Sequence, residues 1–245
     1  SIRRQRQMCI RDSLYPFLKR PWKSIIRHAL CVTAPSDFLI QKIQDITRDG
    51  TFRTIANGLD LARFKPLKKE KKILIVARLF QNKGIQDILD ALKGIDIGDW
   101  TVDIVGDGPY REALEQKARI NGVSGRIRFH GWIDNESDDM KKFYGRAAIF
   151  ISASYFESFG LTVLEAISAG CYPLVSDIGG HRFILNDDRF FFSKEDSGEL
   201  REKLKGLMKR GPGDFSIDIE RFSWNNVIRD YLSLLERGSE TVRHH

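Results

Sequence analysis

The chain has 245 residues, of which 42% are hydrophobic and 30% charged, with a net charge of +7; this composition excludes a disordered chain and indicates a globular protein with a buried core. No apolar run approaches the about 20 residues that span a bilayer, and the Arg-rich start lacks the apolar core of a signal peptide. The cysteines Cys9, Cys31 and Cys171 are far apart and form no CxxC pair, which argues against a disulfide framework and a zinc site.

The first thirteen residues show no apolar periodicity and resemble a translated sequencing adapter, so we predict that residues 1–13 are a non-native, disordered segment. Basic residues gather at the start of the chain and again near residue 70: Arg3, Arg4, Arg6, Arg11, Lys19, Arg20, Lys23, Arg27, and then Lys68, Lys69, Lys71 and Lys72. Such clusters bind anionic lipid or nucleic acid, or form a solvated face. Because no aromatic-interleaved RNA motif or zinc finger accompanies them, we expect no nucleic-acid partner and keep peripheral membrane contact as an option.

Residues 14–66 are predicted to form a separate block ahead of the main sheet. Its expected elements are a helix over 14–29, a strand over 31–34, a helix over 36–47 with Ser36 as its N-cap, and a strand over 52–55. The pair Asn57-Gly58 predicts a turn, and Lys65-Pro66 closes the block.

From residue 67 to 222, short β-rich runs alternate with helical patterns, which predicts an α/β domain with a doubly wound parallel, Rossmann-like sheet. The expected strands are Ile73–Ala77, Val102–Val105, Ile127–Phe129, Ile149–Ser152, Pro173–Ser176 and Phe190–Phe192. The clearest helices are Ile85–Leu92, Tyr110–Asn121, Leu161–Ala169 and Gly198–Met208. A last helix is expected over 223–237, followed by a tail over 238–245.

The loops that follow the strands are the places to look for a site, because ligands of open α/β sheets bind beyond the carboxyl ends of the strands. The first of these loops carries Arg78 and Lys83, which suit phosphate oxygens but are also compatible with two exposed surface cations. The second contains Gly106-Asp107-Gly108-Pro109, where the glycines allow close backbone approach. It lacks the third glycine of a GxGxxG fingerprint, so it gives little support to NAD binding.

The loop after the fourth strand is the most informative. Gly160 ends the loop, and an apolar helix begins at once, so the first helix amides and the positive end of the helix dipole offer a phosphate site. Glu157 and Glu165 flank that site, which suits a ligand with hydroxyl groups on both sides of a phosphate. For Glu165 alone, complementarity to the helix dipole is an alternative worth only ~0.3–1 kcal/mol.

These residues resemble a known family. Glu157 and Glu165 match the E-x7-E pattern of retaining GT-B glycosyltransferases, especially family 4, and the whole stretch is similar to the family's Glu-Ser-Phe-Gly-Leu core. Further similar segments are Ile55–Asp60 at the domain crossover, Val76–Leu79 with Lys83-Gly84, Ile104–Pro109, and Phe222-Ser223-Trp224 at the start of the last helix. The resemblance covers about Leu14 to Glu236 and implies the C-terminal, donor-binding half of a GT-B fold.

The resemblance also implies a role for each matching position. Arg78 and Lys83 would neutralise the diphosphate leaving group, so that no metal or cofactor is required. Glu157 would contact the donor sugar, and Glu165 would hold the ribose hydroxyls. Gly106 would be a further donor-binding position. The backbone amides of Gly160, Leu161 and Thr162 would contact the phosphates, and Trp132 and Ile133 would form the base site.

This sequence departs from the family in two ways. Where the family often has Glu after the Gly179-Gly180 pair, this chain has Phe183, preceded by His181 and Arg182, which puts donor fine structure in doubt. About 150 residues of acceptor domain, the size of a typical domain, are expected to be missing, so residues 14–66 would be a remnant of it. Neither His28 nor His130 has the context of the active-site His that the family carries there.

The function implied by the resemblance is that of a retaining hexosyltransferase that uses a UDP- or GDP-sugar donor and a glycan or lipid-linked acceptor, in cell-envelope polysaccharide synthesis. We expect it in the cytoplasm, with the inner membrane face as an option. This stretch alone is expected to bind donor without transferring sugar. The alternatives are a fragment that only binds nucleotide-sugar, and a sugar-nucleotide epimerase of GT-B fold, which the Glu157–Glu165 pattern does not support.

Overall fold

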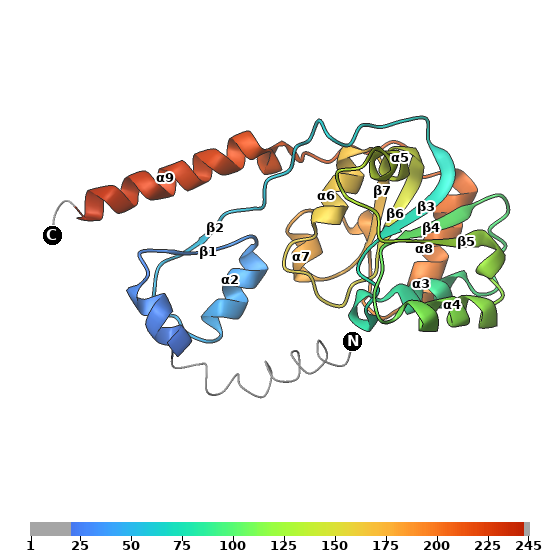
Figure 1. Cartoon of the computed structure of the whole chain (residues 1–245), viewed down its shortest axis with the longest axis horizontal. Coiled ribbons are helices and arrows are strands. Elements are labelled where there is room, and N and C mark those ends of the chain that lie inside the picture. Colours follow the sequence, from blue (N-terminus) through green and yellow to red (C-terminus); the bar gives the residue numbers. More distant parts are fainter. Residues whose placement is uncertain (1–20, 243–245) are drawn as a thin grey trace. The chain divides into compact units, whose positions relative to one another are not determined.

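The computed structural model describes residues 21–242, with side chains as far as residue 236, as two compact units (Figure 1). The larger unit runs from Gly58 to Trp224, and the smaller combines the described residues up to Asn57 with those from Asn225. The predictions for residues 1–13 and for the start of the first helix lie outside the described residues.

The larger unit is built on one parallel sheet of six strands, in the order β5-β4-β3-β6-β7-β8. The strands are β3 (Glu70–Val76), β4 (Thr101–Val105), β5 (Ile127–Gly131), β6 (Ala147–Ser152), β7 (Tyr172–Ser176) and β8 (Phe191–Phe192). In the central strand β3, Ile73 aligns with Val102 of β4 on one side and with Ile149 of β6 on the other. Both faces of β3 are covered, which explains its unbroken apolar run, and the predicted doubly wound α/β fold is confirmed.

Helices cover the two faces of this sheet (Figure 1). One face carries α3 (Ile85–Leu92), α4 (Arg111–Ile120) and α8 (Ser197–Arg210), and the other carries α5 (Asp138–Arg146) and α6 (Leu161–Ser168). Shorter elements are α7 (Gly179–Arg182), η1 (Gln81–Lys83), η2 (Ser124–Arg126), η3 (Asp188–Phe190) and η4 (Glu220–Phe222). Helix α5 was not among the predicted helices, although Ser137 caps it by accepting a hydrogen bond from the amide of Met140 at 3.2 Å.

The segment from residue 58 to 66 belongs to the sheet unit, which therefore begins nine residues before the predicted start at residue 67. Phe64 is fully buried, and the hydroxyl of Ser168 in α6 donates to the carbonyl of Leu61 at 2.9 Å. Lys65-Pro66 lies at the end of this packed segment and not at the boundary between the two units.

The two ends of the sheet unit are tied to each other. The amide of Leu59 donates to the carbonyl of Phe222 at 2.8 Å, and Leu59 forms a parallel β-bridge with Ser223. A Cβ on Gly58 would lie 2.4 Å from the Trp224 ring, so the indole rests directly on the Gly58 backbone. The chain therefore enters and leaves this unit at one place.

The smaller unit has a parallel strand pair, β1 (Val32–Ala34) and β2 (Phe52–Thr54), joined through α2 (Asp37–Gln44). Ser36 caps α2 as predicted, because its side chain accepts from the amide of Leu39 at 3.3 Å. The last helix, α9 (Trp224–Val242), continues past the end predicted at residue 237, so residues 238–242 are helical and not a tail. Its apolar side chains Ile228, Tyr231, Leu232 and Leu235 are exposed.

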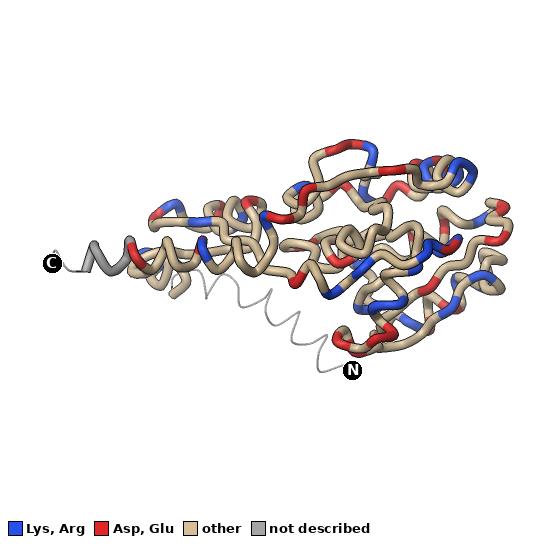
Figure 2. Tube along the Cα trace, turned by 90° about the horizontal axis from the view of Figure 1, so that it is seen from above, with Lys and Arg blue, Asp and Glu red and all other residues tan. Residues whose placement is uncertain are grey.

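The lysine cluster near residue 70 is not a free cationic patch. Lys71 pairs with Asp99 at 2.9 Å and Lys72 with Glu70 at 2.6 Å, and Figure 2 shows Lys and Arg interleaved with Asp and Glu along the chain. Lys69 points inward and donates to the carbonyl of Ala169, the C-cap of α6, at 2.6 Å, and its burial lowers the pKa of its ammonium group. No helix within residues 21–242 is long and apolar enough to cross a membrane.

Candidate donor-binding site

The loops at the carboxyl edge of β3, β4 and β5 are hydrogen-bonded to one another. The amide of Ala77 donates to the carbonyl of Val105 at 3.1 Å, and the amide of Gly106 donates to the carbonyl of Gly131 at 2.8 Å. Gly106 has a φ of +131°, and a Cβ there would lie 1.9 Å from the Ala77 carbonyl oxygen. Gly106 is thus required for loop packing, and its contact with a ligand stays a prediction.

Lys83 and Glu157, predicted from separate loops, form an ion pair. Their side chains are 13% and 23% exposed, so the pair sits at the mouth of the site and is only partly solvated. The hydroxyl of Ser154, which is buried, donates to the same Glu157 oxygen at 2.8 Å, and the amide of Tyr155 donates to the carbonyl of Asn82 at 2.9 Å. This backbone bond holds the two loops in register, and Glu157 neutralises Lys83.

Arg78 is not part of that pair. Its side chain is exposed, its guanidinium carbon lies 5.5 Å from the centroid of the Phe80 ring, and it makes no ion pair with any residue between 21 and 236. An arginine in this state keeps its full charge and hydrogen-bonding fork for an incoming anion.

The start of α6 offers unsatisfied donors. Gly160 is the N-cap, with no side-chain hydrogen bond, and the amides of Leu161 and Thr162 have no acceptor among the described residues. Leu161 is 42% exposed, which leaves this helix end open. Amides at a helix N-terminus attract anions through hydrogen bonding and the helix dipole, so the geometry suits the predicted phosphate site.

Glu165 is buried, and both of its oxygens are held. The Tyr144 hydroxyl donates to Oε2 at 2.7 Å, and the Asn135 side-chain amide donates to Oε1 at 3.1 Å. Burial raises the pKa of Glu165, while these two hydrogen bonds oppose the rise. Glu165 lies beyond the first turn of α6, so complementarity to the helix dipole does not explain its position. Each oxygen keeps a further lone pair for a ligand hydroxyl.

The predicted base site lies in the loop after β5, where Trp132 is 74% exposed and Ile133 is half-buried. A hollow of about 350 Å³ adjoins Ile133 and is lined further by Lys72, His130, Asp139, Lys142, Phe143 and Arg146. It lies along α5, away from Lys83 and Glu157. Its cations are paired with carboxylates, Lys142 with Asp139 at 3.0 Å for example, and no open helix start among the described residues lines it.

His181 is a member of the site region to which the sequence analysis gave no role. Its ring is fully buried, with Nδ1 2.8 Å from the carbonyl oxygen of Ser176 and Nε2 3.2 Å from the hydroxyl of Ser152. These distances place the proton on Nδ1. Burial lowers the pKa of His181 to about 4, so the ring is neutral at pH 7. Its partners Ser152 and Ser176 end β6 and β7, a meeting that no local sequence pattern reveals.

Neutral burial of His181 predicts a loss of stability in mild acid. Below about pH 6.5 the unfolded chain binds a proton on this ring, whereas the folded protein takes it up only near pH 4. The free energy of unfolding should therefore fall by about 2 kcal/mol between pH 6.5 and 5 through this group alone. Urea unfolding of wild type and His181→Asn across this range measures the difference.

His181→Asn retains a donor toward Ser176 and removes the titration, so its stability should depend less on pH than that of wild type. His28→Asn, at an exposed residue, is the matched control and should follow wild type. Parallel curves for wild type and His181→Asn would contradict a neutral buried ring.

Comparison with known proteins gives consistent results. Residues 60–218 match the family model described as glycosyl transferases group 1. The chain is 26% identical over 233 residues to the lipopolysaccharide core biosynthesis glycosyltransferase LpsE of Rhizobium meliloti, covering 89% of this chain and 61% of that protein. It is 28% identical over 203 residues to the alpha-monoglucosyldiacylglycerol synthase of Streptococcus pneumoniae, covering 75% of this chain and 45% of that protein. The chain spans about half the length of the curated relatives it matches.

The fold also matches solved structures. The structure of HepE from Anabaena in complex with UDP and glucose superposes with a TM-score of 0.70 at 19% identity, covering 92% of this chain and 66% of that one. The six-stranded parallel sheet with helices on both faces is the arrangement of these GT-B glycosyltransferase neighbours.

Proposed function

Because this chain belongs to the glycosyl transferases group 1 family, we propose that it supplies the donor half of a retaining, family 4-like glycosyltransferase, transferring a hexose-type sugar from a UDP- or GDP-sugar. The observation that carries the proposal is the meeting of Lys83, Glu157 and the open start of α6 at one edge of the sheet. Cations and free amides there suit a diphosphate, and the carboxylates suit sugar hydroxyls.

The proposed mechanism stabilises the departing diphosphate. Breaking the bond between the sugar and the diphosphate leaves negative charge on the phosphate oxygens. Lys83 and the α6 amides are held in place before the reaction, so they stabilise that charge without reorganising, and the exposed Arg78 would add its guanidinium when the anion binds. Glu157 would orient the donor sugar, and Glu165 the ribose. Trp132 and Ile133 would border the base.

The acceptor and the cellular setting are inferred from the relatives. LpsE belongs to lipopolysaccharide core synthesis, and the pneumococcal relative makes a glucosyl lipid. We propose a glycan or lipid-linked acceptor and a role in cell-envelope polysaccharide synthesis, with the protein in the cytoplasm or against the inner membrane face. Transfer would also require an acceptor-binding domain.

Calorimetry of the chain with UDP, GDP and ADP, their sugar conjugates and the three nucleosides tests the donor proposal. At least one uridine or guanosine diphosphate should bind, and its nucleoside should bind more weakly, because the diphosphate contacts are lost. A well-folded sample that binds no member of the panel would remove the proposal.

Glu165→Ala should weaken binding of the preferred nucleoside diphosphate tenfold or more. A hydrogen bond to a charged group contributes about 1.5–3 kcal/mol, and the ribose would lose its acceptor. Titration calorimetry gives the affinity, and Glu115→Ala in α4, a carboxylate paired with Arg111, serves as a control that should bind as wild type does. Unchanged affinity in Glu165→Ala would remove Glu165 from the ribose role.

A further inference from the structure

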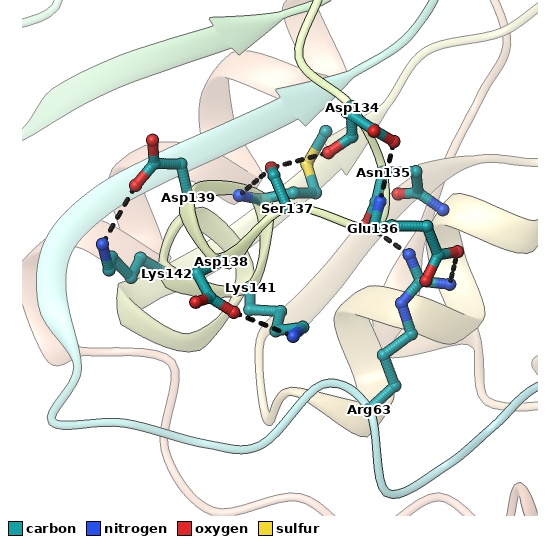
Figure 3. A network of polar contacts seen from close by, with 10 residues as sticks. Arg63, Asp134, Asn135, Glu136, Ser137, Asp138, Asp139, Lys141 and Lys142 are labelled. Carbon is teal, nitrogen blue, oxygen red and sulfur yellow. Dashed lines mark hydrogen bonds and ion pairs between the residues drawn. The ribbon is translucent and has the colours of Figure 1, made fainter.

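Arg63 is a largely buried cation to which the proposed function gives no role. Its side chain is 17% exposed, and Nη1 lies 2.6 Å from a carboxylate oxygen of Glu136. Nη2 donates to the carbonyl oxygen of Asn135, and Figure 3 shows the guanidinium pointing at these two residues of one loop. Its Nε is buried without a partner among the described residues. An unpaired nitrogen on a buried charge is costly, so Arg63 is not an ordinary solvated cation of the protein surface.

The loop that Arg63 contacts joins the predicted base site to α5. Within it, the amide of Glu136 donates to the Asp134 side chain at 3.0 Å, and the Ser137 hydroxyl donates to the Asp134 carbonyl at 2.6 Å (Figure 3). These bonds close the loop into a hydrogen-bonded turn. Arg63 fastens that turn from outside, through both a backbone carbonyl and a side chain.

One side chain of this turn reaches the candidate ribose residue. Asn135 uses its backbone carbonyl to accept from Arg63 and its side-chain amide to donate to Glu165 at 3.1 Å. Four groups act on the Glu165 carboxylate: the Tyr144 hydroxyl, the Asn135 side-chain amide, and the charges of Glu136 and Arg63. Burial raises the pKa of Glu165, and the Arg63 charge opposes that rise.

Arg63 has a firm base from which to act. The next residue, Phe64, is fully buried, and the hydroxyl of Ser168 lies 2.9 Å from the carbonyl oxygen of Leu61 and 3.3 Å from that of Phe64. Ser168 is the last residue of α6, the helix that also carries Glu165. The arginine and the carboxylate are thus fixed to the same helix.

We propose that Arg63 is a positioning residue for the nucleoside end of the donor site, clamping the 134–137 turn so that Asn135 holds Glu165 ready to accept the ribose hydroxyls. This inference rests on the proposed function of the site. The Asn135 carbonyl and the Glu136 carboxylate must be held at the same time. The planar guanidinium fork of arginine can do this, whereas the ammonium of lysine acts as a single point charge. Arg63 itself touches neither sugar nor phosphate.

The test compares two probes on wild type, Arg63→Met and Arg63→Lys: the nucleoside diphosphate that wild type binds, and inorganic pyrophosphate. Arg63→Met should weaken nucleotide binding about tenfold and leave pyrophosphate binding unchanged, because the phosphate groups lie on the other loops. Loss of the cation raises the pKa of Glu165 further, so this carboxylate is protonated at a higher pH in Arg63→Met. As the pH is lowered, the nucleotide affinity of the variant should therefore begin to fall at a higher pH than that of wild type. Arg63→Lys should restore the pH profile but not the full affinity.

Two further variants keep the inference testable. Glu165→Gln carries no titrating carboxyl, so adding Arg63→Met to it should not alter the pH profile. Asn135→Ala cuts the link to Glu165 and leaves the Arg63 contacts in place; it should repeat the nucleotide-specific loss even if Arg63→Met does not fold. The role of Arg63 would be overturned if a variant lost affinity for both probes equally. It would also be overturned if folded Arg63→Met, or Asn135→Ala, kept the nucleotide affinity of wild type. Wild type that binds pyrophosphate but no nucleotide would instead refute the proposed function.

Discussion

Lys83→Met should weaken binding of the nucleoside diphosphate by about 10- to 150-fold, the factor that corresponds to one charged hydrogen bond of about 1.5–3 kcal/mol. The variant also leaves Glu157 without its ion-pair partner, so that, among the described residues, only the Ser154 hydroxyl still contacts its carboxylate. An unpaired carboxylate beside the phosphate site repels the ligand, so the loss should lie toward the upper end of this range. Titration calorimetry at fixed ionic strength measures it.

The double variant Lys83→Met/Glu157→Gln separates these two effects. Removing the unpaired charge of Glu157 should recover part of the affinity for the diphosphate, while the nucleoside should bind all variants alike. Lys71→Met is the matched control, because Lys71 pairs with Asp99 on an exposed surface. If Lys83→Met bound the diphosphate as tightly as wild type, Lys83 would have no part in holding the leaving group.

Gly106→Ala should destabilise the sheet unit by about 4 kcal/mol, the sum of a left-handed backbone penalty of about 1–2 kcal/mol and overpacking of about 1–3 kcal/mol. The added Cβ would lie 1.9 Å from the carbonyl oxygen of Ala77, so the loops after β3 and β4 must separate. For a chain of this size, the melting temperature should fall by about 10 °C. Thermal unfolding followed by circular dichroism gives the value.

Gly122→Ala is the control for the backbone term. Gly122 also has a positive φ, of +72°, but nothing lies within 4 Å of its added Cβ. It should cost only about 1–2 kcal/mol. Equal shifts for the two variants would mean that the close loop approach at Gly106 has no energetic weight.

The fold could be predicted from the sequence because its pattern is local. The run Ile73-Leu74-Ile75 is typical of a strand buried on both faces, and Gly160 ahead of an apolar run predicts the start of α6. The loops of the candidate site were predicted by the same logic, since every parallel strand ends at the same edge of the sheet. Boundaries were less certain: α9 runs beyond the expected residue 237, and segment 58–66 joined the sheet unit.

The partnerships within the site could not be predicted, because they join residues that are distant in the sequence. Lys83 and Glu157 meet through the register of two loops, 74 residues apart. His181 depends on Ser152, 29 residues earlier, and Arg63 on Asn135, 72 residues later. A resemblance assigns Glu165 a role, but only the packing around it identifies Tyr144 and Asn135 as its holders.

The bridge between Leu59 and Ser223 gives the sheet unit a topological property. Its first and last residues lie side by side, about 5 Å apart as in any pair of neighbouring strands, although 164 residues separate the bridged positions. The backbone of this unit is therefore nearly a closed ring. Such a ring can be joined by a short peptide and reopened at an exposed turn, for instance at Gly122, which has open space around it. The unit is thus suited to circular permutation, and to transfer as an insertion into a surface loop of another protein.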